Sequence, residues 1–222
     1  MKAKLISHSQ APDYNESALD LIAYCARVSN PDNQNNKETN EKLVKYLMKH
    51  KHWSPLEMVS ACIEVETTRD IARQLIRHRS FSFQEFSQRY ADPVKELEMI
   101  PREARLQDTK NRQNSIAIDQ TDESQRRINE DWRMKQMAHI RQTADLYNWA
   151  IDNGIAKEQA RAVLPEGNTV SRLYVNGTLR SWVHYIELRE ANGTQLEHIE
   201  IAKEVAKVIH KIFPLTLQNE TV

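Results

Sequence analysis

The residues best suited to chemistry are the arginines and the histidine between positions 69 and 79. Arg69, Arg73 and Arg77 follow one another at intervals of four, which would place them on one face of a helix. Two like-charge pairs at this spacing cost only ~0.2–0.5 kcal/mol each, and Asp70 offsets part of that cost. A solvated basic face is the simplest interpretation, and a binding site for an anion is the alternative.

The neighbouring residues favour the anion site. Gln74, Arg77 and His78 share one face of the same predicted helix, and the segment 80–90 is rich in serine, phenylalanine and glutamine. Guanidinium groups bind phosphate through paired hydrogen bonds, while hydroxyl and amide groups bind the edge of a ring. Aromatic side chains stack on planar rings. The composition therefore favours a nucleotide site that needs no glycine-rich loop.

The scarcity of glycine excludes the common phosphate-binding loops. Gly154, Gly167, Gly177 and Gly193 are the four glycines of the chain, and each is at least ten residues from the next. Neither G-x-G-x-x-G nor a Walker A loop can be formed from them. The sequence also lacks the H-E-x-x-H motif of zinc proteases and the G-x-S-x-G motif of serine hydrolases.

The cysteines and the paired histidines do not indicate a redox or metal centre. Cys25 and Cys62 are 37 residues apart, which excludes a C-x-x-C pair, so we expect reduced thiols in the interior. His50 and His52 are spaced like metal ligands on a strand, but no carboxylate or cysteine is placed to complete a site. We expect no bound metal.

The length and charge of the chain are typical of a soluble globular protein with one domain over residues 1–222. The 222 residues contain 31 Lys and Arg against 31 Asp and Glu, so the net charge is zero and a long-range field for nucleic acid is not expected. The hydrophobic content is 40%, and no apolar stretch approaches the 18 residues of a membrane span. The first residues lack the apolar core of a signal peptide. We expect a cytoplasmic protein that binds neither nucleic acid nor membrane.

The order of the predicted elements indicates the α+β class. Alternating side chains predict a half-buried strand over 59–66, after which Thr67 or Thr68 caps the basic helix. Strands and helices are mixed without a regular βαβ alternation. The other predicted elements are strands over 3–7 and 169–175, and helices over 14–28, 41–50, 156–164 and 195–213, with a further helix capped by Thr178.

A long amphipathic helix is predicted from residue 128 to residue 152. It ends at Asn153 and Gly154. The polar segment 92–124 before it, which contains Pro93 and Pro101, is interpreted as a long excursion within the domain. The residues predicted to face inward from this helix are Trp132, Ile140, Ala144, Tyr147 and Ile151.

Four sequence motifs together resemble one protein family. Arg77, His78 and Arg79, followed after seven residues by Ser87, resemble the R-H-R-x7-S signature of the flavin-dependent thymidylate synthases. From average residue usage, this pattern arises by chance at on the order of a few per million start positions. The segments 52–57, 161–165 and 180–189 resemble the H-x-[S/T]-P-x-E, R-x-V-L-P and R-[S/A]-x-x-[H/N]-(x4)-R motifs of the family, in the same order. The resemblance spans roughly residues 15–213.

The resemblance implies an activity and an assembly. It implies methylation of dUMP to dTMP, with methylenetetrahydrofolate as the carbon donor and FAD, reduced by NADPH, as the hydride source. It also implies a homotetramer with active sites at subunit junctions, and a twisted, mostly antiparallel sheet packed with a layer of long helices. The implied dUMP-binding residues are Gln74, Arg77, Glu85, Phe86, Ser87, Gln88, Arg89, Arg161 and Arg189. The implied FAD-binding residues are Ser54, Arg77, His78, Arg79, Glu85, Thr178, Leu179, Arg180 and His184.

The chemistry of these residues agrees with that division. The dUMP phosphate needs several charge-assisted donors, which Arg89, Ser87 and Arg161 can supply. We assign Ser87 to phosphate binding rather than nucleophilic attack, because no base in the motif is left to activate it. Arg189 is the catalytic candidate, since a guanidinium at the uracil edge stabilises an N3-deprotonated ring and raises the electron density at C5.

Two departures from the family pattern concern the flavin site. Met58 stands where relatives often have histidine, and Thr178 where many have asparagine. Glu57 and Glu85 also permit a purely structural interpretation.

Two other functions remain open. One is a nucleotide- or RNA-binding module that stacks bases on Phe81, Phe83 and Phe86. The other is a cofactor-free pyrimidine-modifying enzyme with Cys25 or Cys62 as its nucleophile, which the absence of an adjacent base disfavours.

Overall fold

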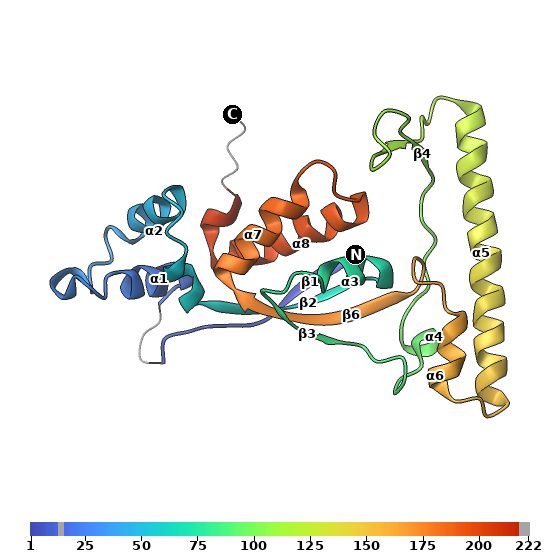
Figure 1. Ribbon diagram of the computed structural model, residues 1–222, viewed down its shortest axis with the longest axis horizontal. Coiled ribbons are helices and arrows are strands. Elements are labelled where there is room, and N and C mark those ends of the chain that lie inside the picture. Colours follow the sequence, from blue (N-terminus) through green and yellow to red (C-terminus); the bar gives the residue numbers. More distant parts are fainter. Residues whose placement is uncertain (13–15, 218–222) are drawn as a thin grey trace. The chain divides into compact units, whose positions relative to one another are not determined.

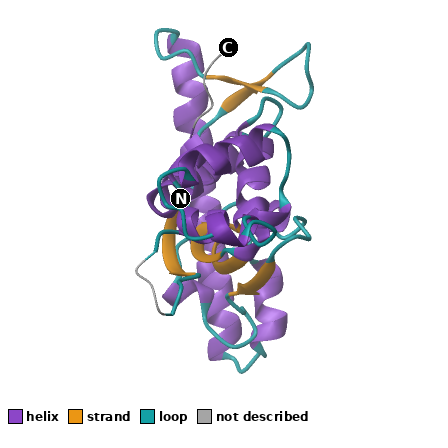
Figure 2. Cartoon of the chain, turned by 90° about the vertical axis from the view of Figure 1, so that its left-hand side faces the viewer, coloured by secondary structure: helices purple, strands orange, loops and turns teal. Residues whose placement is uncertain are grey.

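Two strands that are far apart in the sequence form the centre of the sheet. β2 (Ser60–Thr68) pairs with β6 (Val170–Thr178) in the computed structural model, which describes residues 1–12 and 16–217 (Figure 1). β1 (Lys2–His8) lies beyond β2 and β3 (Ser82–Glu85) beyond β6, so the strand order is β1-β2-β6-β3. This antiparallel sheet and the helices confirm the predicted α+β class (Figure 2).

The predicted alternation of β2 is present in the structure. Every second residue from Ala61 to Thr67 is buried, and the residues between them are half-buried. Trp182, which is fully buried, donates a hydrogen bond from its indole Nε1 to the carbonyl of Ala61 over 3.0 Å. The polar tip of this large side chain is thus satisfied inside the core.

The contacts of the chain gather in two compact units, and β2 and β6 each run from one unit into the other. Within the described residues, unit 1 comprises 1–12, 16–65, 76–84 and 173–217, and unit 2 comprises 66–75 and 85–172. The prediction of one catalytic domain over 1–222 stays a prediction. The two units are described separately.

Unit 1 contains the first two helices and the last two. α7 (Leu179–Glu190) packs on α8 (Leu196–Ile212), and α8 also packs on β1. The predicted bounds of α8 are confirmed to within one residue at each end. The unit is completed by the 3-10 helices η1 (Pro31–Asn33), η2 (Ser54–Met58) and η4 (Pro214–Leu217).

The two N-terminal helices of unit 1 pack against each other. α1 (Ala18–Ala26) is preceded by Ser17, which forms a reciprocal capping box with Asp20. α2 (Asn40–Lys49) agrees with the helix predicted over 41–50. Residues 14 and 15 of the helix predicted over 14–28 lie outside the described residues.

Unit 2 contains the longest helix, α5 (Glu123–Asp152), which has 30 residues and an Asp122 cap. It begins five residues before the predicted start at residue 128. The hairpin of β4 (Arg105–Gln107) and β5 (Ser115–Ala117) pairs Leu106 with Ile116. The segment 92–124, interpreted from the sequence as a long excursion, thus contains a short hairpin and the helix α4 (Pro93–Glu96). The remaining helices of the unit are α3 (Arg69–Leu75), α6 (Lys157–Ala160) and the 3-10 helix η3 (Arg161–Val163).

The apolar contacts of α5 lie toward its C-terminal end. Tyr147 and Ala150 pack with Ala160 and Leu164 in a buried cluster. The prediction that Trp132 faces inward is wrong, because its exposed fraction is 46%. Near Trp132 the helix is bound through polar groups instead, such as the Gln136 amide, which exchanges two hydrogen bonds with the backbone of Arg102.

The predicted basic helix is shorter than its spacing suggested. α3 ends at Leu75, so Arg77 lies beyond it and the expected face of Arg69, Arg73 and Arg77 does not form. Arg69 is also buried, with an exposed fraction of 8%, and is not part of a solvated surface. No helix among the described residues combines the length and the apolar character needed to cross a bilayer.

Candidate functional site

Five of the predicted dUMP residues, Glu85 to Arg89, lie in unit 2 at the end of β3 and in the loop that follows it. This loop is fixed to β6 because the Phe86 N–H donates to the carbonyl of Arg172 over 2.9 Å. The Ser87 carbonyl then accepts the N–H groups of Tyr90 and Ala91, at 3.1 and 3.0 Å, which closes a turn. The serine is thereby held at a tight bend with its side chain half-buried.

The surroundings of the Ser87 hydroxyl do not include a group that could activate it as a nucleophile in the described part of the chain. The Ser87 Oγ accepts the Arg89 N–H at 3.4 Å, and no basic side chain among the described residues hydrogen-bonds it. A serine nucleophile requires such a base. The hydroxyl proton remains available for an external acceptor.

Gln88 supplies a buried donor without an acceptor. Its exposed fraction is 5%, and its amide Nε2 has no hydrogen-bond partner in the described part of the chain. A buried polar group left unpaired costs about 1–3 kcal/mol, so a ligand acceptor at this nitrogen would be stabilising.

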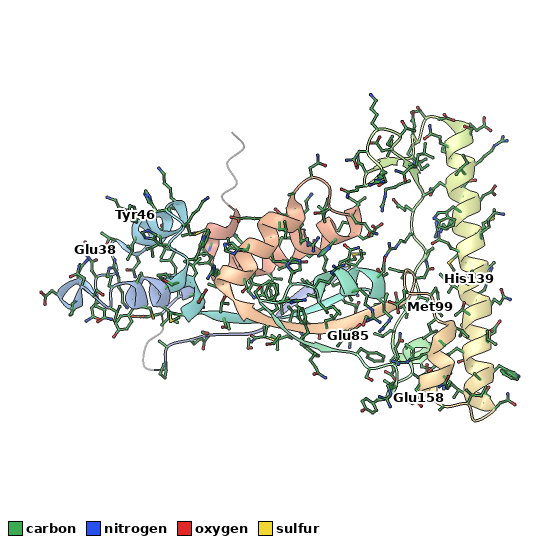
Figure 3. All side chains as sticks on the ribbon, in the orientation of Figure 1. Glu38, Tyr46, Glu85, Met99, His139 and Glu158 are labelled. Carbon is green, nitrogen blue, oxygen red and sulfur yellow. The ribbon has the colours of Figure 1, made fainter. Side chains whose placement is uncertain are left out.

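Two arginines flank this loop in unit 2. Arg89 pairs with Glu158 of α6 at 3.1 Å, with both side chains at least half exposed (Glu158 is labelled in Figure 3). Exposed pairs contribute only about 0.2–1 kcal/mol, so a phosphate can replace this carboxylate. Lys157, next to Glu158, donates to the Tyr90 carbonyl at 2.9 Å and joins the loop to α6. Arg161, in the 3-10 helix η3, is half-buried, and its side chain has no acceptor among the described residues.

Glu85, which is labelled in Figure 3, lies at the end of β3 and already has protein partners. Its Oε1 accepts from Ser171 Oγ at 2.7 Å and from Arg69 at 3.3 Å. Arg69 also donates to Glu166 at 3.3 Å, which Arg73 contacts at 3.4 Å. Arg69 therefore neutralises carboxylates inside unit 2 and is structural. Gln74, also predicted for dUMP, is half-buried on α3.

In unit 1 the R-H-R segment presents two exposed arginines on either side of a half-buried histidine. Arg77 and Arg79 have no hydrogen-bond or ion-pair partner in the described part of the chain. His78 instead accepts a hydrogen bond at its Nε2 from Arg189 Nε, over 2.8 Å. Burial, reinforced by the Arg189 charge, lowers the pKa of His78 to about 4, so its ring is neutral near pH 7.

The N-terminal end of α7 meets η2 in unit 1. Arg180 of α7 forms an ion pair with Glu57 of η2, and the His184 ring lies edge-on to Trp53 at 4.5 Å. Ser54, the first residue of η2, is exposed. Three of the predicted FAD residues (Ser54, Arg180 and His184) thus come from two helices that pack together.

The residue that caps α7 and the one after it have definite structural roles. The Thr178 side chain accepts the Ser181 N–H at 3.3 Å as the helix cap. Leu179 is fully buried, and its N–H donates to the Val59 carbonyl at 2.8 Å.

Sequence reasoning did not single out three residues that contact this machinery. The sequence left a structural interpretation of Glu57 open, and its place in the H-x-S-P-x-E stretch is the signal that could have marked it. Tyr185 and His198 lie beside His78 in unit 1, with ring centroids 5.1 and 6.4 Å from its own. No sequence motif marked them.

The donors of both units suit the same kind of ligand. Each unit presents guanidinium groups without buried acceptors, and no cluster of three or more metal-binding side chains exists among the described residues. Guanidinium forks match phosphate in shape and charge. The fold is α+β, and this donor set suits a ligand that carries phosphate groups.

Comparison with known proteins gives the family. The thymidylate synthase complementing protein (Thy1) family matches residues 6–215. A probable flavin-dependent thymidylate synthase of Paramecium bursaria Chlorella virus 1 is 47% identical over 216 residues, 96% of each chain. A flavin-dependent thymidylate synthase of Synechocystis sp. is 49% identical over 87% of this chain and 85% of its own.

A solved structure agrees with these relatives. The crystal structure of the UMP/dUMP methylase PolB from Streptomyces cacaoi, bound with 5-Br dUMP, has a TM-score of 0.76 and 27% identity. The match covers 97% of this chain and 92% of PolB. The chain belongs to the thymidylate synthase complementing protein family. The prediction of a flavin-dependent enzyme of this family is thereby confirmed.

Proposed function

We propose that the protein methylates dUMP to dTMP, using methylenetetrahydrofolate as the carbon donor and NADPH-reduced FAD as the hydride source. The names of its relatives and the 5-Br dUMP bound to PolB support dUMP as the substrate. The observation that carries the proposal is the set of donors around residues 87–89 that lack buried protein acceptors: the Ser87 hydroxyl, the Gln88 amide and the Arg89 guanidinium.

We assign dUMP binding to the loop of unit 2 and its flanking arginines. Ser87, Arg89 and Arg161 bind the phosphate, since a dianion is best satisfied by several charge-assisted donors. Glu85 uses its Oε1 for Ser171 and Arg69, which leaves Oε2 to accept a ligand N–H. The full proposed dUMP set is Gln74, Arg77, Glu85, Phe86, Ser87, Gln88, Arg89, Arg161 and Arg189.

The donor set of unit 1 fits FAD. A pyrophosphate held without a glycine-rich loop needs cationic side chains, and Arg77, Arg79 and Arg180 provide three of them. FAD supplies hydride chemistry when bound, and the protein positions it. The full proposed FAD set is Ser54, Arg77, His78, Arg79, Glu85, Thr178, Leu179, Arg180 and His184.

Arg189 is the proposed catalytic residue. Its fixed positive charge stabilises a uracil ring that has lost its N3 proton, which raises the electron density at C5 for attack on the methylene donor. A homotetramer with active sites at subunit junctions is also proposed, in which residues of two chains can complete one site. The cytoplasmic location stays a prediction.

The test uses purified protein. A flavin absorbance spectrum that bleaches on anaerobic addition of NADPH, together with release of the C5 hydrogen of dUMP in the presence of methylenetetrahydrofolate, is expected. A colourless protein that neither takes up FAD nor releases this hydrogen would contradict the proposal. Salt-sensitive RNA binding by such a protein would favour the binding-module alternative.

A further inference from the structure

Three rings lie together in unit 1, and we call them the imidazole–phenol cluster: the half-buried His78 and the buried Tyr185 and His198. Tyr185 on α7 and His198 on α8 have exposed fractions of 1% and 0%. The Tyr185 hydroxyl lies 3.2 Å from His198 Nε2, within hydrogen-bond distance. The His78 ring stands perpendicular to both neighbours, at 81° to Tyr185 and 87° to His198.

This cluster supplies Arg189 with an unusual hydrogen-bond acceptor. Arg189 Nε donates to His78 Nε2, so that nitrogen must carry a lone pair and the His78 proton must sit on Nδ1. The two terminal nitrogens of Arg189 have no acceptor in the described part of the chain. The guanidinium plane is thus fixed by the hydrogen bond at Nε, and both terminal nitrogens remain available to a ligand.

A neutral acceptor has a different electrostatic effect from a carboxylate. Arg180 in the same unit pairs with Glu57, whose negative charge offsets its own. An imidazole fixes the plane of a guanidinium but carries no charge, so the positive charge of Arg189 is undiminished for an anionic ligand. This benefit is lost when His78 is protonated, because an imidazolium has no lone pair to accept the bond and repels the arginine.

The surroundings of His78 keep it neutral. The titratable groups that face it are Tyr185 and Arg189 from α7 and His198 from α8, while Phe81 lies near it on its own segment. None is a carboxylate. Burial raises the pKa of Tyr185, and burial with the charge of Arg189 lowers the pKa of His198 to about 3, so both of these rings are uncharged near pH 7.

We infer that Tyr185 and His198 are positioning residues: their mutually hydrogen-bonded, uncharged side chains back the His78 ring, hold its Nε2 toward Arg189 and so deliver an oriented, uncompensated guanidinium to the anionic pyrimidine. The inference deepens the proposed function and rests on it for the identity of the ligand. Tyr185 and His198 act through His78 and Arg189 and are not catalytic themselves.

The test compares wild-type holoenzyme with Tyr185→Phe, which keeps the ring but removes the hydroxyl, and with His198→Gln. Nitrogen-15 NMR of labelled histidine reports the tautomer and pKa of His78 without substrate. We expect the wild-type ring to be protonated on Nδ1 and to titrate near 4, and its pKa to rise toward 6.5 in both variants, since loss of the pair admits water. The affinity for dUMP, measured by titration, should then fall about tenfold relative to wild type at pH 5.5 and change little at pH 8.

Controls separate positioning from general damage to the fold. Tyr147→Phe removes another buried hydroxyl, one without a partner among the described residues. This variant should bind dUMP at pH 5.5 with the affinity of the wild type. Protonation of the dUMP phosphate changes the affinity of every protein equally, so it cancels when each variant is compared with the wild type at the same pH. A wild-type His78 that titrates near 6.5, or variants that lose affinity equally at every pH, would overturn the inference. If His78 responds as expected but wild-type protein does not bind dUMP, the cluster is supported and the proposed function is refuted.

Discussion

At the scale of single residues, the acceptor opposite each arginine decides what that arginine can do. Arg69 lies buried between Glu85 and Glu166, so its charge is used within the fold. Arg89 has one exposed carboxylate that a phosphate can displace. Within the described residues, the acceptor of Arg189 is the neutral His78 alone. Arg69, which has the most protein acceptors, is therefore the least available to a ligand, and Arg189, which has no carboxylate partner, is the most available.

Replacing Arg189 by lysine tests the need for a planar fork. Lysine keeps the charge, but a point charge cannot donate to His78 and present two further parallel donors. We expect Arg189→Lys to retain its flavin and to lose roughly 10²-fold in turnover, the effect of removing one preorganised donor. Arg141→Lys, an exposed change on α5, serves as the control. Release of the C5 hydrogen of dUMP measures the rate, and a wild-type rate in Arg189→Lys would refute the assigned role.

Replacing Ser87 by alanine separates binding from covalent catalysis. Loss of one hydrogen bond to a charged phosphate should weaken dUMP binding about tenfold or more. Turnover at saturating dUMP should remain measurable, because no base activates Ser87 for attack. The exposed Ser82→Ala on β3 is the matched control. Complete loss of chemistry with unchanged dUMP affinity would instead establish Ser87 as a nucleophile.

The sequence predicted which residues to watch but not how they pair. The R-H-R-x7-S motif singled out His78, and the separate motif over 180–189 singled out Arg189. Their hydrogen bond joins positions 111 residues apart, and that of Arg69 with Glu166 joins positions 97 apart. Such pairs depend on the topology of the sheet and helices, which local spacing does not encode.

At the scale of elements, tertiary packing overrides helical spacing after Leu75. The residue pattern alone predicts a helix that includes Arg77 and His78, but the chain leaves the helix after Leu75 and turns. Phe81 then packs against Trp182, with ring centroids 4.5 Å apart, and its exposed fraction is 8%. Burying a large aromatic ring outweighs the helix propensity of the few residues before it. Strand β2 was predictable for the opposite reason, because its alternation and its packing agree.

A glycine on β6 makes the packing of Phe81 possible. A Cβ added at Gly177 would lie 2.3 and 2.6 Å from two carbons of the Phe81 ring, which real contacts do not reach. Gly177→Ala must displace this ring from Trp182, at an expected cost of about 1–3 kcal/mol in the free energy of unfolding. Urea denaturation followed by tryptophan fluorescence measures it.

A second glycine provides the control for this prediction. Nothing lies within 4 Å of a Cβ added at Gly167, and its backbone does not require glycine. We expect Gly167→Ala to be neutral or slightly stabilising, because alanine restricts the unfolded chain. Equal unfolding midpoints for the two variants would show that Phe81 adapts without cost.

At the scale of the whole molecule, the proposed ligands divide between the two units. All of the proposed FAD residues except Glu85 belong to unit 1, and all of the proposed dUMP residues except Arg77 and Arg189 belong to unit 2. Equal numbers of acidic and basic residues, 31 of each, mean that anion binding arises from local placement of arginines and not from net charge. Composition alone could therefore argue against a long-range positive field for nucleic acid, but it could not locate the proposed FAD-binding or dUMP-binding residues.

The half-buried His78 and the buried His198 of unit 1 make the stability of the protein depend on pH. The folded-state pKa values of His78 and His198, about 4 and about 3, lie below the ordinary value of 6.5 that each regains on unfolding. Between these values the unfolded chain binds more protons than the folded one, so the free energy of unfolding is highest above pH 6.5 and falls as the pH drops toward 4. For the fully buried His198 the slope approaches about 1 kcal/mol per pH unit in the middle of this window. His198→Gln should remove that slope from urea-unfolding data collected between pH 6 and pH 4, whereas His139→Gln, at an exposed position of α5, should not (Figure 3). Parallel pH dependences for wild type and His198→Gln would mean that His198 is protonated in the folded protein as readily as in the unfolded chain.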